Sequence, residues 1–231
     1  MHSPNIAQTT LRRHRGLIEM AAAVGLTIAG LLVVGDPPAP VLAQGAGVPV
    51  NELMASEALP DIALGASNAP VTIVEYASMT CVHCAGFHAT TYPDLKSKYI
   101  DTGKVRFILR EFPLDPLAAA GFMLARCAGD DKRNAIVDLL FDQQKNWAFT
   151  EKPVEALANL LKQTGMSQSA FEACLKNQDL FNKIAQVHDE AAAKFGVSAT
   201  PTFFINGKKE NGEMSPDALE KLIDPLLKGK S

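Results

Sequence analysis

The sequence predicts an α/β fold whose sheet is split by an inserted all-helical domain. Two β-rich stretches, residues 71–111 and 201–213, flank a long stretch in which apolar residues recur at intervals of three and four. The predicted order is therefore β-α-β, then helices, then β-β-α. The alternative is a separate helical domain followed by a stray hairpin, but it leaves the last strand without a sheet to join.

The first β-rich stretch carries the clearest local signals. The run VTIVEY over 71–76 is β-branched and aromatic, which is typical of a buried strand. A helix is expected to begin near Cys81 with Thr80 as its N-cap, because threonine side chains accept hydrogen bonds from the first helical amides. Pro93 should kink or restart this helix, and residues 105–111 form the second predicted strand.

Helical periodicity dominates the middle of the chain. Glycines and Asp/Asn-rich turns, such as Gly129-Asp130-Asp131 and Gly165, separate its segments. The predicted helices cover residues 117–128, 133–144, 154–165, 169–177 and 180–195.

β structure returns at residues 201–205. Asn206-Gly207 then signals a hairpin turn, followed by a short edge segment over 208–213. Ser215 is the expected N-cap of a last helix over 216–227, which has proline in its first position.

These elements divide the chain into segments. Residues 44–69 are small, polar and proline-punctuated, so we expect a linker with a short lead-in element around residues 50–58. The predicted bounds are 70–115 and 197–231 for the two halves of the sheet domain, and 116–196 for the helical insertion.

Residues 1–43 have the basic region, apolar region and cleavage site of a secretory signal peptide, in that order. Basic residues at 12, 13 and 15 precede an uncharged apolar run over 20–34, and small or apolar residues lead to Ala43. We expect export and cleavage near Ala43. The alternative is a retained membrane anchor, because the apolar run, if extended to residues 17–35, is nearly long enough to span a bilayer.

Composition excludes one class of partner. The chain has 22 Lys and Arg against 25 Asp and Glu, a formal net charge of −3, and no basic cluster with interleaved aromatic residues. Nucleic acid is therefore not an expected partner. All 4 cysteines follow the predicted cleavage site, and an oxidising compartment permits disulfides there.

The chemistry is predicted from Cys81-Val82-His83-Cys84, which follows the first strand and opens a helix. Disulfide exchange needs a thiolate, and the unpaired amides and dipole of a helix start stabilise one. Cys81 is the expected nucleophile, and Cys84, nearly one turn deeper, is the more buried resolving thiol. His83 should lower the pKa of Cys81 further, which makes the disulfide a stronger oxidant.

Two alternatives exist for this cysteine pair. A structural zinc site usually needs a second pair of ligands at similar spacing, whereas Cys127, Cys174, His88 and His188 are scattered. A purely structural disulfide is the other alternative. We expect neither a metal nor another cofactor.

Two further positions are candidates for the site. Glu75 lies in the middle of the first strand, where it is either a solvated acid near a strand end or a buried proton acceptor for Cys84. The bond between Thr200 and Pro201 can be cis at modest energy. A cis bond just before a strand would aim a free backbone edge at the sulfurs.

Taken together, these motifs resemble the DsbA-like branch of the thioredoxin superfamily. The resemblance rests on VTIVEY, Cys81-Val82-His83-Cys84, the helical insertion and the run TPTFFING from Thr200, and it covers residues 61–227. It implies thiol–disulfide oxidoreductase activity in the bacterial periplasm. It also implies that Pro201 is a cis-proline, that Thr200 contacts the bound chain through its backbone, and that Glu75 is the buried acid.

The resemblance also implies partners: reduced or unfolded secreted polypeptides, and a membrane redox protein that resets the pair. Val82 replaces the proline of the best-known member, and Thr200 is closer to isomerase and reductase relatives. The direction therefore stays open between oxidase and isomerase or reductase, and a non-redox holdase or metal-binding module is a third alternative. The short segment before the first strand favours a monomer.

Cys127 and Cys174 both flank apolar periodic positions. Two free core thiols are one interpretation. Because some members of the family have such a bond, we favour a structural disulfide that joins two helices of the insertion.

Overall fold

The computed structural model describes residues 47–55 and 58–229. The predicted signal peptide, its cleavage near Ala43 and the first residues of the predicted linker lie outside these ranges. None of the helices in the described ranges combines the length and apolarity that a bilayer span requires.

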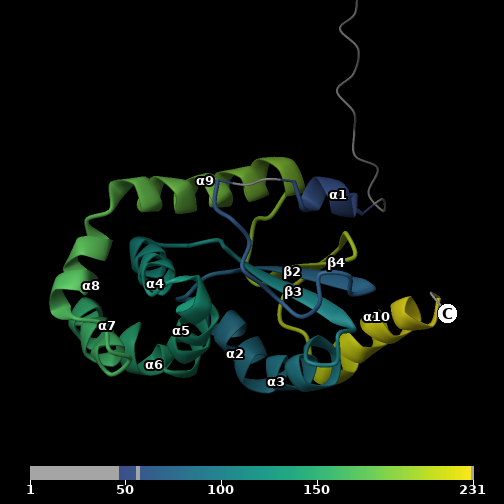
Figure 1. Cartoon of the computed structure of the whole chain (residues 1–231), viewed down its shortest axis with the longest axis horizontal. Helices are drawn as coiled ribbons and strands as arrows, with labels where there is room; N and C mark the ends of the chain where they lie inside the picture. The colour runs from purple at the N-terminus through teal and green to yellow at the C-terminus, as the bar shows by residue number, and fades with distance from the viewer. Residues whose placement is uncertain (1–46, 56–57, 230–231) are drawn as a thin grey trace, which may run out of the picture. The chain divides into compact units, whose positions relative to one another are not determined.

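A five-stranded sheet is the centre of the fold (Figure 1). Its strands are β1 (Ala63–Leu64), β2 (Val71–Ala77), β3 (Val105–Glu111), β4 (Thr202–Ile205) and β5 (Lys208–Asn211). They lie in the order β1-β3-β2-β4-β5, with β2 and β3 parallel and the other neighbours antiparallel. The last two strands therefore join the sheet that the first two begin, and the stray-hairpin alternative is wrong.

The sequence does not predict β1, because two residues carry no readable periodicity. Ala63 and Leu64 pair with Ile108 and Phe107 of β3. Upstream, the short helix α1 (Val50–Leu53) lies within the expected lead-in element and buries its last residue. Part of the segment expected as a linker is thus packed into the fold.

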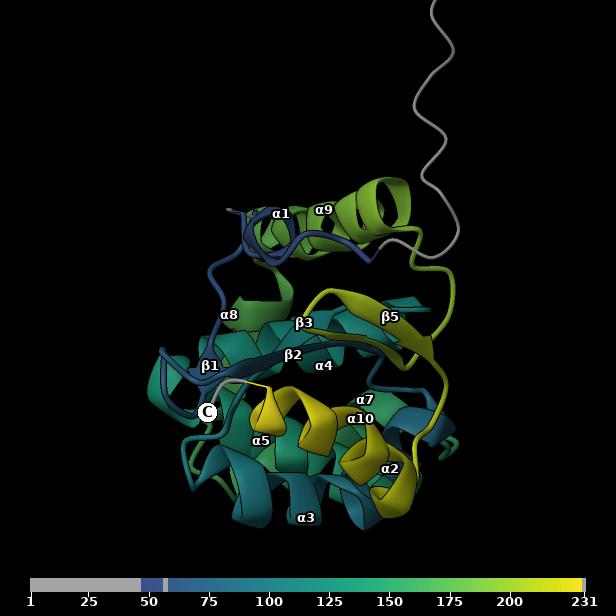
Figure 2. The same ribbon diagram turned by 90° about the vertical axis from the view of Figure 1, so that its right-hand side faces the viewer.

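Helices cover both faces of the sheet (Figure 2). One face carries α2 (Val82–Thr90), α3 (Tyr92–Leu95), the π-helical turn η1 (Lys96–Ile100) and α10 (Pro216–Lys228). The other face is covered by α1 and by α9 (Gln178–Phe195), whose Ala191 and Phe195 pack with Val74 and Phe204. Both β2 and β3 are buried at every position except their second, as expected of strands that are covered on both faces.

The helical insertion runs from α4 to α9. Its other helices are α4 (Pro116–Cys127), α5 (Asp130–Asp142), α6 (Gln144–Trp147), α7 (Pro153–Lys162) and α8 (Gln168–Leu175). α5 begins earlier than predicted because Gly129 turns the chain at φ 98° and two aspartates then occupy the first turn, where negative charge is favourable. It ends at Asp142, two residues before the predicted end, and Gln144 begins the separate helix α6.

A disulfide joins Cys127 at the end of α4 to Cys174 in α8, with Cα atoms 6.1 Å apart. The two cysteines are separated by 47 residues. In the chain-entropy model a bond closing a loop of that length contributes about 4 kcal/mol. The two cysteines are thus paired in the structure and brace two insertion helices.

Local signals decide several boundaries. Ser215 caps α10 as predicted, because its side chain accepts a hydrogen bond from the Ala218 amide. Asn206-Gly207 forms the predicted turn, with both residues at positive φ. The expectation of Thr80 as the N-cap of α2 is wrong: Cys81 takes that position, and the Thr80 hydroxyl donates elsewhere.

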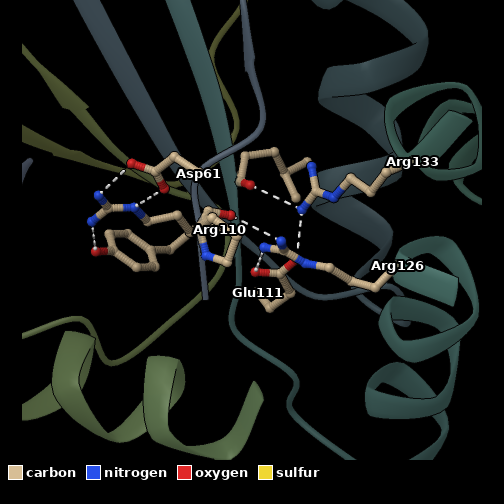
Figure 3. Close-up of polar contacts among 8 residues, drawn as sticks. Asp61, Arg110, Glu111, Arg126 and Arg133 are labelled. Atoms are coloured by element: carbon tan, nitrogen blue, oxygen red, sulfur yellow. Dashed lines mark hydrogen bonds and ion pairs between the residues drawn. The ribbon is translucent and has the colours of Figure 1, made fainter. Parts of the chain in front are cut away.

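A buried ion cluster fastens the insertion to the end of β3 (Figure 3). Glu111 accepts hydrogen bonds from Arg126 of α4 at 2.9 Å and from Arg133 of α5 at 2.7 Å. Beside it, Arg110 donates to both carboxylate oxygens of Asp61. Burial alone would raise the pKa of Glu111, but the charges of Arg133 and Arg126 lower it to about 2.

We expect Glu111→Gln to lower the free energy of unfolding by about 3–5 kcal/mol, because it leaves two buried guanidinium groups without their counter-charge. The folded pKa of about 2 lies below the reference value of 4.5. The wild-type stabilisation is therefore present above pH 4.5 and is lost as the pH falls towards 2, a dependence that the variant should lack. Urea unfolding across this range measures both effects.

Asp101→Asn is the matched control, because it breaks an exposed ion pair with Lys96. Its expected cost is below about 1 kcal/mol. Equal losses in the two variants would contradict the role given to the buried cluster.

Candidate active site

Cys81 lies where the chain leaves β2 and enters α2. It is the N-cap of that helix, and its sulfur accepts a hydrogen bond from the Cys84 amide at 3.4 Å. The sulfur therefore sits at the positive end of the helix dipole. Cys81 keeps 9% exposure whereas Cys84 has none. Cys81 is thus the cysteine that a partner can reach first.

These contacts lower the pKa of the Cys81 thiol from 9.0 to about 5. The largest contribution is the hydrogen bond from the Cys84 side chain, and burial acts in the opposite direction. Thr200 and the backbone amides of Cys84 and His83 add to the lowering. At neutral pH the Cys81 sulfur is therefore a thiolate, the form that attacks disulfides.

Cys84 is held in the opposite protonation state. Burial above all raises its pKa well above 9.0, and the hydrogen bond to Cys81 and the charge of Glu75 act in the same direction. In the dithiol form Cys84 is a neutral thiol. It must lose a proton before its sulfur can react.

His83 contributes differently from the expectation. Its ring is 69% exposed, and Nδ1 lies 3.2 Å from Oε2 of Glu213. The part of His83 that lowers the pKa of Cys81 is its backbone amide. The Glu213 carboxylate also lies over Gly86, where a Cβ would come within 2.5 Å of Oε1. A glycine at this position leaves room for Glu213 beside His83.

Thr200 and Pro201 lie beside the cysteine pair. The peptide bond between them is cis, and β4 begins at the next residue. The Cys81 sulfur lies 3.3 Å from the Thr200 carbonyl oxygen, although the two residues are 119 positions apart in the sequence. The structure therefore brings the predicted substrate-binding residues to the predicted nucleophile.

Glu75 is fully buried in the middle of β2, opposite Leu109 of β3 and Phe203 of β4. The alternative of a solvated acid near a strand end is therefore wrong. Oε2 of Glu75 lies 3.0 Å from Nε2 of His88 on α2. Its charge raises the pKa of Cys84, so the two groups interact, while the predicted role as proton acceptor stays a prediction.

Comparison with known proteins decides the family. The family model described as Thioredoxin matches residues 57–225. The chain belongs to the thioredoxin family. The thioredoxin-like fold with an inserted helical domain is confirmed by this match and by the structural likeness described next.

Three relatives illustrate the likeness. A Rickettsia conorii protein named as a putative protein-disulfide oxidoreductase is 34% identical over 168 residues, which are 72% of this chain and 60% of that protein. The probable disulfide bond formation protein D of Bacillus anthracis is 30% identical over 172 residues, 71% of this chain and 77% of that one. The crystal structure of Wolbachia pipientis alpha-DsbA1 has a TM-score of 0.71 and 32% identity, and the match covers 78% of this chain and 96% of that one.

Two side chains, one within the insertion and one just before it, hold the thioredoxin-type loop that carries Cys81, and sequence reasoning missed both. Gln144, buried at the start of α6, donates from its amide to the carbonyl oxygens of Met79 at 2.9 Å and Cys81 at 3.0 Å. Asp115, the N-cap of α4, accepts a hydrogen bond from Thr80 at 2.5 Å. Asp before Pro is a readable cap signal, whereas nothing marks Gln144, because its partners are backbone atoms.

We expect Cys84→Ala to raise the pKa of Cys81 from about 5 towards 9.0, because it removes the largest contact that lowers it. Thiolate ultraviolet absorbance as a function of pH measures the shift. Cys84→Ser keeps a hydroxyl donor at the same position and should stay closer to the wild type. If the pKa of Cys81 stayed near 5 in both variants, the start of the helix alone would hold the thiolate.

A second prediction concerns the loop. Gln144→Leu removes the side-chain donor to the Met79 carbonyl and one of two donors to the Cys81 carbonyl, which also accepts from the Ala85 amide. It should therefore lower the free energy of unfolding by about 1–3 kcal/mol and slow the reaction of Cys81 with a small disulfide. Gln143→Leu is the control, because Gln143 bonds to exposed Asp142 and Asn146. Its expected change is within about 0.5 kcal/mol. If the two variants had the same free energy of unfolding and the same reaction rate of Cys81, Gln144 would not support the loop.

Proposed function

We propose that this chain is a thiol–disulfide oxidoreductase that introduces disulfides into reduced polypeptides through the Cys81–Cys84 pair. The observation that carries the proposal is the Cys81 sulfur at the start of α2, with a pKa lowered to about 5 and with Cys84 three residues on. The relatives named for disulfide chemistry support the same reaction class.

The proposed reaction moves two electrons from the substrate to the cysteine pair. A substrate thiolate attacks Cys81 of the Cys81–Cys84 disulfide, and Cys84 leaves and takes up a proton. A second substrate thiolate then attacks the substrate sulfur of the mixed disulfide, and Cys81 leaves as a thiolate. The low pKa of Cys81 makes it a good leaving group in this last step.

The same low pKa favours the oxidising direction. A stabilised thiolate stabilises the dithiol form, and so makes the disulfide the stronger oxidant. The runner-up is an isomerase or reductase that uses the same pair in reverse, which Thr200 motivates. A non-redox holdase or metal-binding module is the third candidate, and it would not need Cys81 at all.

Substrate docking is assigned to the segment before β4. The Thr200 carbonyl is 3.3 Å from the Cys81 sulfur, so an extended chain bound through its backbone at Thr200 and Pro201 would place its own sulfur next to Cys81. Such backbone pairing is tolerant of side-chain identity. It suits an enzyme that acts on many reduced polypeptides.

The cellular setting is part of the proposal. A protein that oxidises secreted polypeptides would be exported with cleavage near Ala43 and would act in the periplasm. It would be a monomer, and a membrane redox partner would reset its cysteine pair.

The domain bounds at 70–115, 116–196 and 197–231 likewise stay predictions.

We expect the oxidised protein to form disulfides in a reduced multi-disulfide substrate, and Cys81→Ala to abolish this activity. Equilibration with glutathione should give a reduction potential well above the roughly −270 mV of thioredoxin. A potential near that value would argue for a reductant. Efficient repair of a scrambled substrate would favour the isomerase, and activity that survives in Cys81→Ala would favour the non-redox module.

A further inference from the structure

The proposed exchange requires a proton to leave and re-enter a thiol that solvent does not reach. Cys84 is fully buried, and burial disfavours its thiolate. During oxidation of the dithiol, its proton must therefore pass to a neighbouring group before the sulfur can attack. The arrangement around Glu75 supplies such a group and a way out.

Glu75 has one oxygen engaged and one free to accept. Oε2 lies 3.0 Å from Nε2 of His88, whereas Oε1 is buried without a hydrogen-bond partner among the described residues. The charge of Glu75 raises the pKa of Cys84, so the carboxylate acts electrostatically on that thiol. Oε1 is the oxygen of this buried acid that is left to accept a proton.

His88 continues the path from Glu75. Its side chain is only 5% exposed, and its ring is stacked on Phe141 at 4.3 Å and lies against Tyr92 at 4.7 Å. This packing fixes the ring so that Nε2 faces Glu75 and Nδ1 lies 3.8 Å from Oδ1 of Asp138 on α5. Nδ1 has no hydrogen-bond partner within the described part of the chain.

A cavity joins this histidine to solvent. It has a volume of about 270 Å³ and is lined by His88, Tyr92, Lys96, Asp138 and Asp142, among others. The Asp138 side chain is 45% exposed. A water occupies roughly 30 Å³, so one can fit beside the ring and bridge the 3.8 Å gap, which is too long for a direct hydrogen bond.

We propose that His88 and Asp138 form a proton relay that connects Glu75, and through it Cys84, to solvent at this cavity. His88 and Asp138 are positioning residues that act through Glu75 and do not touch the reacting sulfurs. The inference rests on the proposed function, because it concerns the step in which Cys84 reacts.

When the dithiol is oxidised, the Cys84 thiol gives its proton to Oε1 of Glu75, and its sulfur attacks the Cys81 sulfur of a mixed disulfide. The Cys81–Cys84 bond forms, and the other sulfur leaves as a thiolate with the bonding electron pair. Glu75 then passes a proton to Nε2 of His88, while Nδ1 releases one towards Asp138 and the water of the cavity.

Other charged groups surround this relay. Burial raises the pKa of Asp138, while His88, Lys96 and Arg133 oppose that effect and Glu75 adds to it. The titratable or charged groups around the histidine are Glu75 on β2, Cys84 on α2, Tyr92 on α3, Lys96 on η1, and Arg133, Asp138 and Asp142 on α5.

A two-phase reaction separates the two cysteines in one experiment. The reduced full chain is mixed with dithiobis(nitrobenzoate), which releases a coloured thiolate twice. The first release reports attack by Cys81, and the second reports displacement by Cys84. We expect His88→Gln and Asp138→Asn to slow the second release about tenfold or more, while the first stays within about twofold of wild type.

Two measurements distinguish proton transfer from altered packing. Added imidazole should restore the second release in His88→Ala in proportion to its concentration, because it can enter through the cavity. In the relay variants the second release should also become more strongly dependent on pH and on buffer concentration. Asp142→Asn is the control: Asp142 lines the same cavity but is not part of the relay, so its kinetics should match wild type.

A second release of wild-type rate in both His88→Gln and Asp138→Asn would overturn the relay. Equal slowing of both releases, without imidazole rescue, would also overturn it, because the loss would then be one of packing. If His88→Gln does not fold, the exposed Asp138→Asn variant decides the question. Absence of the first release in the wild type would refute the proposed function itself.

Discussion

A single negative sulfur at the first turn of α2 is the constraint on which the site depends. Burial opposes that charge, so it has to be outweighed by a neighbouring thiol, by Thr200 and by backbone amides of the helix start. These groups act only if the helix cannot shift. α2 is therefore packed on the sheet, and the loop before it is tied to the insertion.

The sheet determines which segments meet at that sulfur. Cys81 follows β2 closely, and β4 pairs with β2 in an antiparallel register that sets Tyr76 opposite Thr202. This register is what carries Thr200 and Pro201 to the cysteine pair. A slip of one residue would move every side chain of β4 to the other face of the sheet, so the site inherits its geometry from strand pairing.

Much of this was readable in the sequence, because it depends on local pattern. The β-branched run of β2, the Ser215 cap and the Asn206-Gly207 turn each carry their own signal, and the cysteine spacing marks the helix start. β1 was not readable, because a two-residue edge strand exists only through its partner. Gln144 could not be found for a similar reason: it is polar like many exposed residues, and its partners are distant carbonyls.

The same distinction applies within the candidate site. Cys81, Cys84, Thr200 and Pro201 were predicted from motif and resemblance. Glu75 was also a candidate, but only the fold shows that its side chain is buried. Sequence gave no reason to connect His88 with that acid, since the two are 13 residues apart on different elements. Thr80 shows that a local signal can also mislead. Its hydroxyl could cap α2, but in the structure it donates to Asp115.

The bonds from Gln144 to the loop of Cys81 have a consequence for attempts to reduce the protein to a minimal redox unit. Excising residues 116–196 would remove the Gln144 donor to the carbonyls of Met79 and Cys81, along with the two guanidinium groups that bind Glu111 at the end of β3. The helical block is therefore built into the frame of the reactive loop. A shortened version would need substitute donors at these points before it could hold the same sulfur geometry.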